Sequence, residues 1–141
     1  SASTVEVALP GIIERFYLHL QTFPDARRVL NRMSSIDTLK KRQEEHWAAL
    51  FKHPLDAQYV RRALRVGEAH YRAKVAPYLY IAGYNFVQCE ILSVLSEKHR
   101  AHQDLSLILT AATRVISLDM DLSISVYTRA LWRSQADTVQ I

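Results

Sequence analysis

The sequence is poor in the residues that make turns and disulfides. Its 141 residues include three glycines, four prolines and one cysteine, Cys89. A single cysteine excludes an intramolecular disulfide and argues against a cysteine-based zinc site. With so few glycines and prolines, few β-turns are expected. The long stretches between these residues have helical periodicity. The sequence therefore predicts an all-α protein.

The sequence also lacks long apolar runs and segregated charge. No apolar stretch approaches the roughly 18 residues that span a membrane, and Ser1-Ala2-Ser3 begins no signal-peptide pattern. With 49% hydrophobic residues, the chain suits one soluble, cytoplasmic domain with a single core. The net charge of +4 is spread along the chain, with acids such as Glu44 and Glu68 among the basic residues. We therefore expect no nucleic-acid binding and no membrane segment.

Prolines and capping residues divide the chain into helices. Pro10 suits a first helical position, and the helix that it begins ends near Thr22-Phe23-Pro24. Five more helices are expected: over about 24–31, from a cap at Ser34 or Ser35 to near 52, from a cap at Asp56 to about 74, from Pro77 for about 20 residues, and from near 104 to about 136.

His70 lies in the helix expected after Asp56, among small residues. On its helix face, one and two turns earlier, are Val66, Gly67 and Ala63. They predict a shallow groove in which a flat cofactor can approach the backbone. Because a glycine inside a helix costs about 1 kcal/mol relative to alanine, Gly67 needs a packing or functional reason, such as a haem. We interpret His70 as an iron ligand, and the alternative is an ordinary core or surface histidine.

Two earlier helices carry polar residues on apolar faces. Tyr17 shares a face with Ile13 and Leu20, so its ring is expected to point inward, where its hydroxyl needs a partner. That partner is either a ligand or a backbone carbonyl. A second such face contains Leu39, Arg42, Gln43 and His46.

These segments resemble the globin-coupled sensor family. The resembling blocks are Phe16-Tyr17, Leu39-Lys40-Lys41-Arg42 through His46, the stretch around His70, and Leu118-Asp119-Met120-Asp121-Leu122. They extend from about Ile12 to Tyr127 and agree with the family in order and spacing. The resemblance implies a globin fold, haem b as cofactor, and a sensor domain over residues 1–141 that is isolated from its output domain and has an abbreviated first helix.

The resemblance also gives each candidate residue a role. His70 would bind the haem iron, and Tyr17 would stabilise oxygen on the opposite side. Leu39 would be an apolar gate above the iron, and Arg42 would lie beside the ligand or a propionate, where the family often has a small polar residue. Tyr80 would fix the second nitrogen of His70 by a hydrogen bond, or else pack in the core. Helix faces add Phe51, Val66, Val75 and Tyr84 as lining residues.

His46 has a second possible role. It lies two turns beyond Leu39, and its imidazole could bind the iron opposite His70. The haem would then be six-coordinate, and oxygen would have to displace His46. The position of His46 at the end of the polar face instead suggests the edge of the pocket.

The last two helices are apolar on more than one face. We therefore expect a homodimer in which both copies contribute these helices to a four-helix bundle, as in the family. A fully buried helix in a monomer is the alternative.

The resemblance implies a haem-based oxygen sensor, which also binds CO and NO. Ligand binding would alter dimer packing and regulate an output outside this chain, most often a diguanylate cyclase, so the chain itself is not expected to be an enzyme.

Two other functions stay open from the sequence. A cofactor-free, globin-like signalling scaffold would need no iron, and His70 together with Gly67 argues against it. A haem enzyme of the dioxygenase or peroxidase type needs a polar pocket that delivers protons, which Arg42 with His46 could provide.

Overall fold

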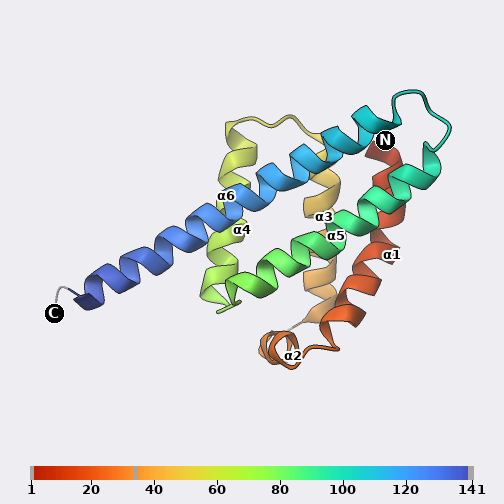
Figure 1. Cartoon of the computed structure of the whole chain (residues 1–141). Helices are drawn as coiled ribbons and strands as arrows, with labels where there is room; N and C mark the ends of the chain where they lie inside the picture. Colours follow the sequence, from red (N-terminus) through yellow and green to blue (C-terminus); the bar gives the residue numbers. More distant parts are fainter. Residues whose placement is uncertain (1, 34, 140–141) are drawn as a thin grey trace.

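The computed structural model describes residues 2–33 and 35–139. Within these ranges the chain forms six α-helices and no strand (Figure 1). They are α1 (Ala2–Leu20), α2 (Pro24–Asn31), α3 (Ile36–Lys52), α4 (Ala57–Arg72), α5 (Pro77–Lys98) and α6 (Leu105–Val139). The all-α prediction is confirmed. None of these helices combines the length and apolarity that crossing a membrane requires.

Most helix ends lie where the capping residues predicted them. The hydroxyl of Ser35 accepts a hydrogen bond from the backbone N–H of Thr38 at 3.2 Å and caps α3, whereas Ser34 lies outside the described residues. Asp56 caps α4 in the same way by accepting from the N–H of Tyr59 at 2.9 Å. Each cap satisfies a backbone donor that has no partner inside its helix.

The start of α1 differs from the prediction. The helix begins at Ala2, so the expectation that Pro10 starts it is wrong. Pro10 lies inside the helix, where its missing N–H costs about 3 kcal/mol. Val5 and Leu9 are nevertheless fully buried and continue the apolar face of Ile12 toward the N-terminus. Their burial, worth about 1.5–3 kcal/mol each, offsets the cost of the proline.

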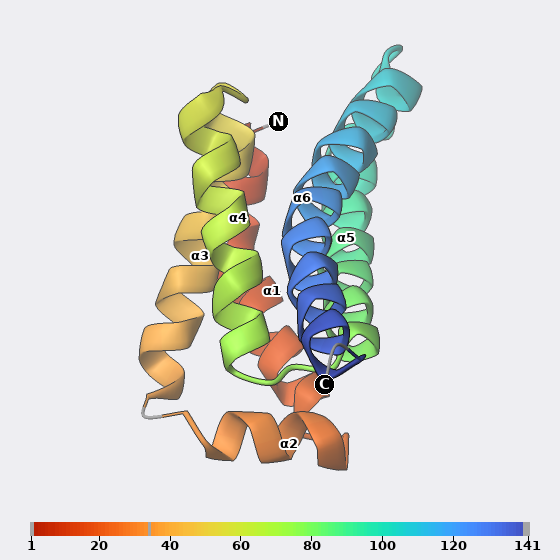
Figure 2. The same cartoon turned by 90° about the vertical axis from the view of Figure 1, so that its left-hand side faces the viewer.

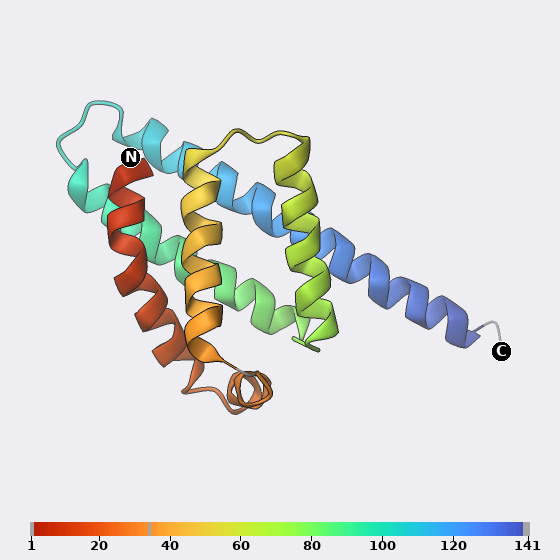
Figure 3. The same cartoon turned by 180° about the vertical axis from the view of Figure 1, so that it is seen from behind.

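The helices form two groups that cross each other. In Figure 2, α5 and α6 lie side by side, and α1, α3 and α4 lie on the other side of the molecule, with α2 across one end. Seen from behind, α1, α3 and α4 cross over the α5–α6 pair (Figure 3). α1 packs against α3 and α5, and α6 packs against α4 and α5. The core therefore lies between the two groups.

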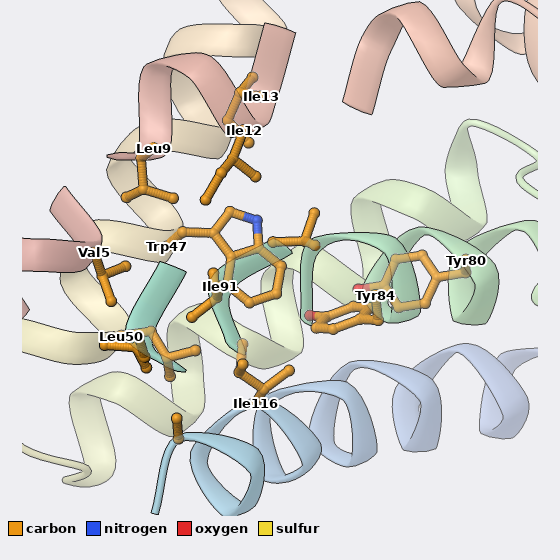
Figure 4. Close-up of a cluster of buried hydrophobic side chains, with 14 of the residues drawn as sticks. Val5, Leu9, Ile12, Ile13, Trp47, Leu50, Tyr80, Tyr84, Ile91 and Ile116 are labelled. Atoms are coloured by element: carbon orange, nitrogen blue, oxygen red, sulfur yellow. The ribbon is translucent and has the colours of Figure 1, made fainter. Parts of the chain in front are cut away.

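Large apolar side chains fill this core. Fully buried members are Leu9, Ile12, Ile13, Ile91, Leu95 and Ile116. Figure 4 shows the Trp47 ring of α3 among buried side chains such as Ile12 and Ile91, with Tyr80 and Tyr84 of α5 farther along. The indole N–H of Trp47 donates to Oε1 of Gln43 at 3.1 Å. The buried tryptophan thus finds its polar partner on its own helix.

α4 and α6 cross at close range at Gly67. A Cβ atom on Gly67 would clash with the carbonyl oxygen of Ser123 and lie 3.1 Å from the Cα of that residue. The fully buried hydroxyl of Ser123 donates to the backbone carbonyl of Ala63 at 3.1 Å. Gly67 therefore allows the two backbones to meet. The interpretation of Gly67 as the floor of a cofactor groove is wrong, because the position of its missing side chain faces α6.

We predict that Gly67→Ala destabilises the protein. Alanine removes the helix cost of glycine, worth about 1 kcal/mol, but its methyl group would press on the backbone of Ser123, which has no flexible end to move. We expect a net loss of about 2 kcal/mol in the free energy of unfolding. Urea unfolding followed by circular dichroism measures it.

Gly11→Ala is the matched control. Gly11 is exposed on α1, and a Cβ there would meet the flexible end of Arg15 at 3.3 Å. Its replacement should leave the free energy of unfolding unchanged or raise it by up to about 1 kcal/mol. Equal effects of the two substitutions would contradict the role of Gly67 in the helix crossing.

Candidate cofactor-binding cavity

A cavity of about 380 Å³ lies between α1, α2, α3, α4 and α5. Its walls are mostly apolar, and its volume falls within the range of about 300–1,000 Å³ that is typical of ligand and cofactor sites. Most of the predicted site residues line it, namely Tyr17, Leu39, Arg42, His46, Val66, His70, Val75, Tyr80 and Tyr84. The structure thus brings together residues from four separate helices and the loop after α4.

Two predicted site residues do not line the cavity. Phe51 is half-buried and packs against the hydrophobic core instead. Gly67 faces α6, as described above. The residues of α4 that line the cavity are Val66, Ala69, His70 and Ala73. The cavity face of α4 is therefore rotated away from Gly67 and Ala63, because those two residues contact Ser123.

One wall was missed from the sequence. α2 and the residues after it contribute Ala26, Val29, Leu30 and Met33. Further unpredicted lining residues are Phe16, Leu20, Gln43, Trp47, Leu79, Gly83 and Val87. The apolar spacing of Ala26, Val29, Leu30 and Met33 is helical and is a signal for one buried face. In an eight-residue helix, that pattern does not indicate which neighbour the face contacts.

His70 presents a free nitrogen lone pair. Its Nδ1 atom lies 2.8 Å from the carbonyl oxygen of Val66. Because a carbonyl oxygen can only accept, Nδ1 carries the hydrogen, and a neutral ring then has a bare Nε2. Burial lowers the pKa of His70 below its ordinary value, although the hydrogen bond to Val66 opposes this effect. The neutral imidazole is the form that binds metals.

The turn after His70 is fixed by the backbone. Lys74 has a positive φ of 59°, which ends α4. Its N–H donates to the carbonyl of Tyr71 at 3.0 Å, and the N–H of Val75 donates to the carbonyl of His70 at 3.1 Å. This pair of bonds is a Schellman motif. It holds Val75 close to His70, so that both line the cavity.

Tyr80 does not hold the second nitrogen of His70. The Val66 carbonyl occupies that nitrogen, so the predicted hydrogen bond from Tyr80 is wrong. The Tyr80 ring instead packs edge-on against the imidazole, with 4.4 Å between ring centroids. Its buried hydroxyl has no hydrogen-bond partner among the described residues. Tyr80 therefore fixes the imidazole by packing.

Tyr17 supplies a hydroxyl to the cavity. The side chain is buried, and burial raises the pKa of Tyr17 to about 12, so the hydroxyl keeps its proton at neutral pH. Across residues 2–33 and 35–139 this hydroxyl makes no hydrogen bond, to a backbone carbonyl or otherwise. The hydroxyl oxygen keeps some accessible surface and can donate a hydrogen bond to a ligand that enters the cavity.

His46 is hydrogen-bonded to the buried carboxylate of Asp119, which lies in one of the resembling blocks but received no role from the sequence. Nε2 of His46 lies 2.7 Å from Oδ2 of Asp119, which is fully buried on α6. The hydroxyls of Tyr84 and Tyr59 donate to the same carboxylate at 2.6 and 2.9 Å. Burial alone raises the pKa of Asp119, but the bonds from His46, Tyr84 and Tyr59 outweigh it, so the pKa lies below its ordinary value.

The helices surround a cavity that is lined by a neutral histidine, an arrangement that a globin has. The sequence model of the Protoglobin family matches residues 1–133, and the chain belongs to this family. Its structure is similar to the globin domain of a globin-coupled sensor from Geobacter sulfurreducens, with a TM-score of 0.78, 18% sequence identity, and coverage of 89% of this chain and 88% of that one. At this identity the likeness shows the fold alone. The predicted globin fold and family resemblance are confirmed.

The residues of the cavity fit a haem. His70 offers Nε2 to an iron, the apolar walls suit a porphyrin ring, and Arg42 brings a positive charge for its carboxylates. Among the described residues, no group of three or more histidine, cysteine or acidic side chains could hold a bare metal ion. One histidine with a bare nitrogen is instead suited to an iron whose other ligands come from a porphyrin.

The stability supplied by Asp119 should depend on pH. Because its native pKa is lowered, its contribution is fully present above the ordinary aspartate pKa of about 3.9 and is lost as the pH falls through the native value. We expect Asp119→Asn to lower the free energy of unfolding by about 2–3 kcal/mol at pH 7, and the difference from the wild type to shrink below about pH 4. Urea unfolding between pH 7 and pH 3 measures both.

Asp121→Asn serves as the control on the same helix, since Asp121 is exposed. It should change stability by less than about 0.5 kcal/mol at every pH. A difference between Asp119→Asn and the wild type that stays constant from pH 7 to pH 3 would refute the ionised state of Asp119.

Proposed function

We propose that the chain is a cytoplasmic, haem-based oxygen-sensor domain. The observation that carries this proposal is His70, whose Nδ1–H donates to the Val66 carbonyl and whose bare Nε2 belongs to a residue lining a cavity of suitable size. The cofactor is haem b, which supplies a ferrous iron that binds oxygen, CO or NO reversibly. The family and the fold support this proposal.

Four other residues around the cavity have separate proposed roles in binding the ligand and the cofactor. Tyr17 would keep its proton and donate a hydrogen bond to a diatomic ligand. Leu39 provides an apolar surface that excludes water from the ligand. Arg42 pairs with the carboxylate edge of the cofactor. Tyr80 holds the His70 ring in place by edge-on packing.

α6 connects this cavity to a second copy of the chain in the proposed sensor. Leu107, Leu118 and Trp132 are exposed along it, Leu107 and Trp132 each at 68%. Their spacings of 11 and 14 residues are close to three and four whole turns, so they lie on one face. We propose a homodimer through α5 and α6, whose packing changes with ligand binding and regulates an output domain, with a diguanylate cyclase as the proposed output.

The two alternative functions have less support. Gly67 no longer argues against a cofactor-free scaffold, because its role is the contact with Ser123. The bare nitrogen of His70 and the cavity still do. A haem enzyme that uses Arg42 and His46 for proton delivery needs a free His46, whereas Nε2 of His46 is bound to Asp119.

The visible absorption spectrum of the haem-loaded protein tests the cofactor and ligand proposals. We expect a five-coordinate ferrous spectrum that shifts reversibly when oxygen is admitted. His70→Ala should lose stoichiometric haem binding. Tyr17→Phe should keep haem but release oxygen about five- to tenfold faster, the effect of losing one hydrogen bond of about 1 kcal/mol. Absence of stoichiometric haem in the wild type would favour the cofactor-free scaffold.

Leu118→Glu tests the dimer. A charge on the exposed face of α6 cannot be buried without a partner, so dissociation is expected. Light scattering after gel filtration should give the wild type twice the chain mass of 16.2 kDa and Leu118→Glu the mass of one chain. Leu18→Glu is the control, because Leu18 is 66% exposed on α1, a helix that is not part of the proposed interface. A wild-type monomer, or equal effects of both changes, would contradict this interface.

A further inference from the structure

The carboxylate of Asp119 is shared by three helices besides its own. Oδ2 receives His46 of α3 and Tyr84 of α5, and Oδ1 receives Tyr59 of α4. Asp119 has no exposed surface. An ionised carboxylate can only accept hydrogen bonds, so all three groups must act as donors. His46 therefore carries a hydrogen on Nε2 and donates it to Asp119.

The hydrogen bond to Asp119 determines which ring nitrogen of His46 is free to bind another group. His46 lines the cavity, and its side chain is 20% exposed. Nε2 is the nitrogen at the far end of the ring, and Asp119 occupies it at 2.7 Å. The other nitrogen, Nδ1, is bonded to the ring carbon that joins Cβ, so its reach from the helix is shorter. Without the carboxylate, Nε2 would lose its only hydrogen-bond partner among the described residues.

We propose that Asp119 is a positioning residue that holds the His46 imidazole against α6 and keeps its Nε2 from entering the cavity. The cavity then offers one imidazole nitrogen, that of His70, and a haem held there would keep a coordination site for a diatomic ligand. This inference rests on the proposed function for its consequence at the iron, and on the hydrogen bonds alone for the holding of His46.

Tyr59 provides a matched control. It donates to Oδ1, whereas His46 binds Oδ2, so Tyr59→Phe removes one bond to the carboxylate and leaves the His46 bond intact. Both Tyr59→Phe and Asp119→Ala weaken the same buried cluster. A general loss of stability would affect both variants alike, whereas release of His46 is expected in Asp119→Ala alone.

The first arm of the experiment uses the haem-free protein. A histidine N–H held by a buried carboxylate exchanges slowly with water and gives a separate proton resonance in nitrogen-15-labelled protein. We expect this Nε2–H resonance of His46, assigned by its absence in His46→Ala, in the wild type and in Tyr59→Phe, and its loss in Asp119→Ala. Asp119→Ser, which leaves a smaller void and is too short to reach His46, repeats the test if Asp119→Ala does not fold.

The second arm uses ferrous, haem-loaded protein. The wild type and Tyr59→Phe should give the five-coordinate spectrum, and Asp119→Ala the low-spin six-coordinate one. Adding His46→Ala to Asp119→Ala should restore the five-coordinate spectrum, which a purely structural role of Asp119 does not predict.

Three outcomes would overturn the inference: no held His46 resonance in the wild type, an unchanged resonance in the Asp119 variants, or a wild type already six-coordinate through His46. An unchanged five-coordinate spectrum in the Asp119 variants would overturn its consequence at the iron. If the wild type binds no haem, the proposed function fails, and the resonance still decides whether Asp119 holds His46.

Discussion

The buried carboxylate of Asp119 is the constraint on which the arrangement of the helices depends. An ionised carboxylate without contact to water costs several kcal/mol unless donors surround it. The donors come from α3, α4 and α5, so these helices must approach α6 at fixed positions. Four helices of the fold thus share one charge, and three of them, α3, α4 and α5, also line the cavity.

The close crossing of α4 and α6 works together with this charge. Ser123 lies one turn after Asp119 on α6, and its backbone meets α4 at Gly67. The same crossing places Tyr59 near the carboxylate and turns His70 toward the cavity. Packing on one face of α4 therefore sets the direction of the neighbouring face, which lines the cavity. The position of the candidate iron ligand follows from contacts that never touch the cavity.

The helices could be predicted from the sequence because their signals are local. Pro24, Ser35, Asp56 and Pro77 stand at or next to the helix starts that they predicted. The helix start predicted at Pro10 was wrong, because the burial of Val5 and Leu9 in the core outweighs the local cost of the proline. His70 and Tyr17 line the cavity, as their helix faces predicted, whereas Gly67 was assigned to the wrong neighbour. Periodicity shows which residues share a face but not what that face contacts. The role of Asp119 was missed because nothing local distinguishes it from the exposed Asp121.

The central claim is that His70 alone offers an imidazole nitrogen to a haem in this cavity. Chemical rescue tests it most directly: His70→Gly is titrated with ferrous haem, with and without free imidazole, and followed by its absorption spectrum. The account predicts that haem binding is lost in the variant and that added imidazole restores the wild-type five-coordinate spectrum. Stoichiometric haem binding by His70→Gly without imidazole, with an unchanged spectrum, would contradict it.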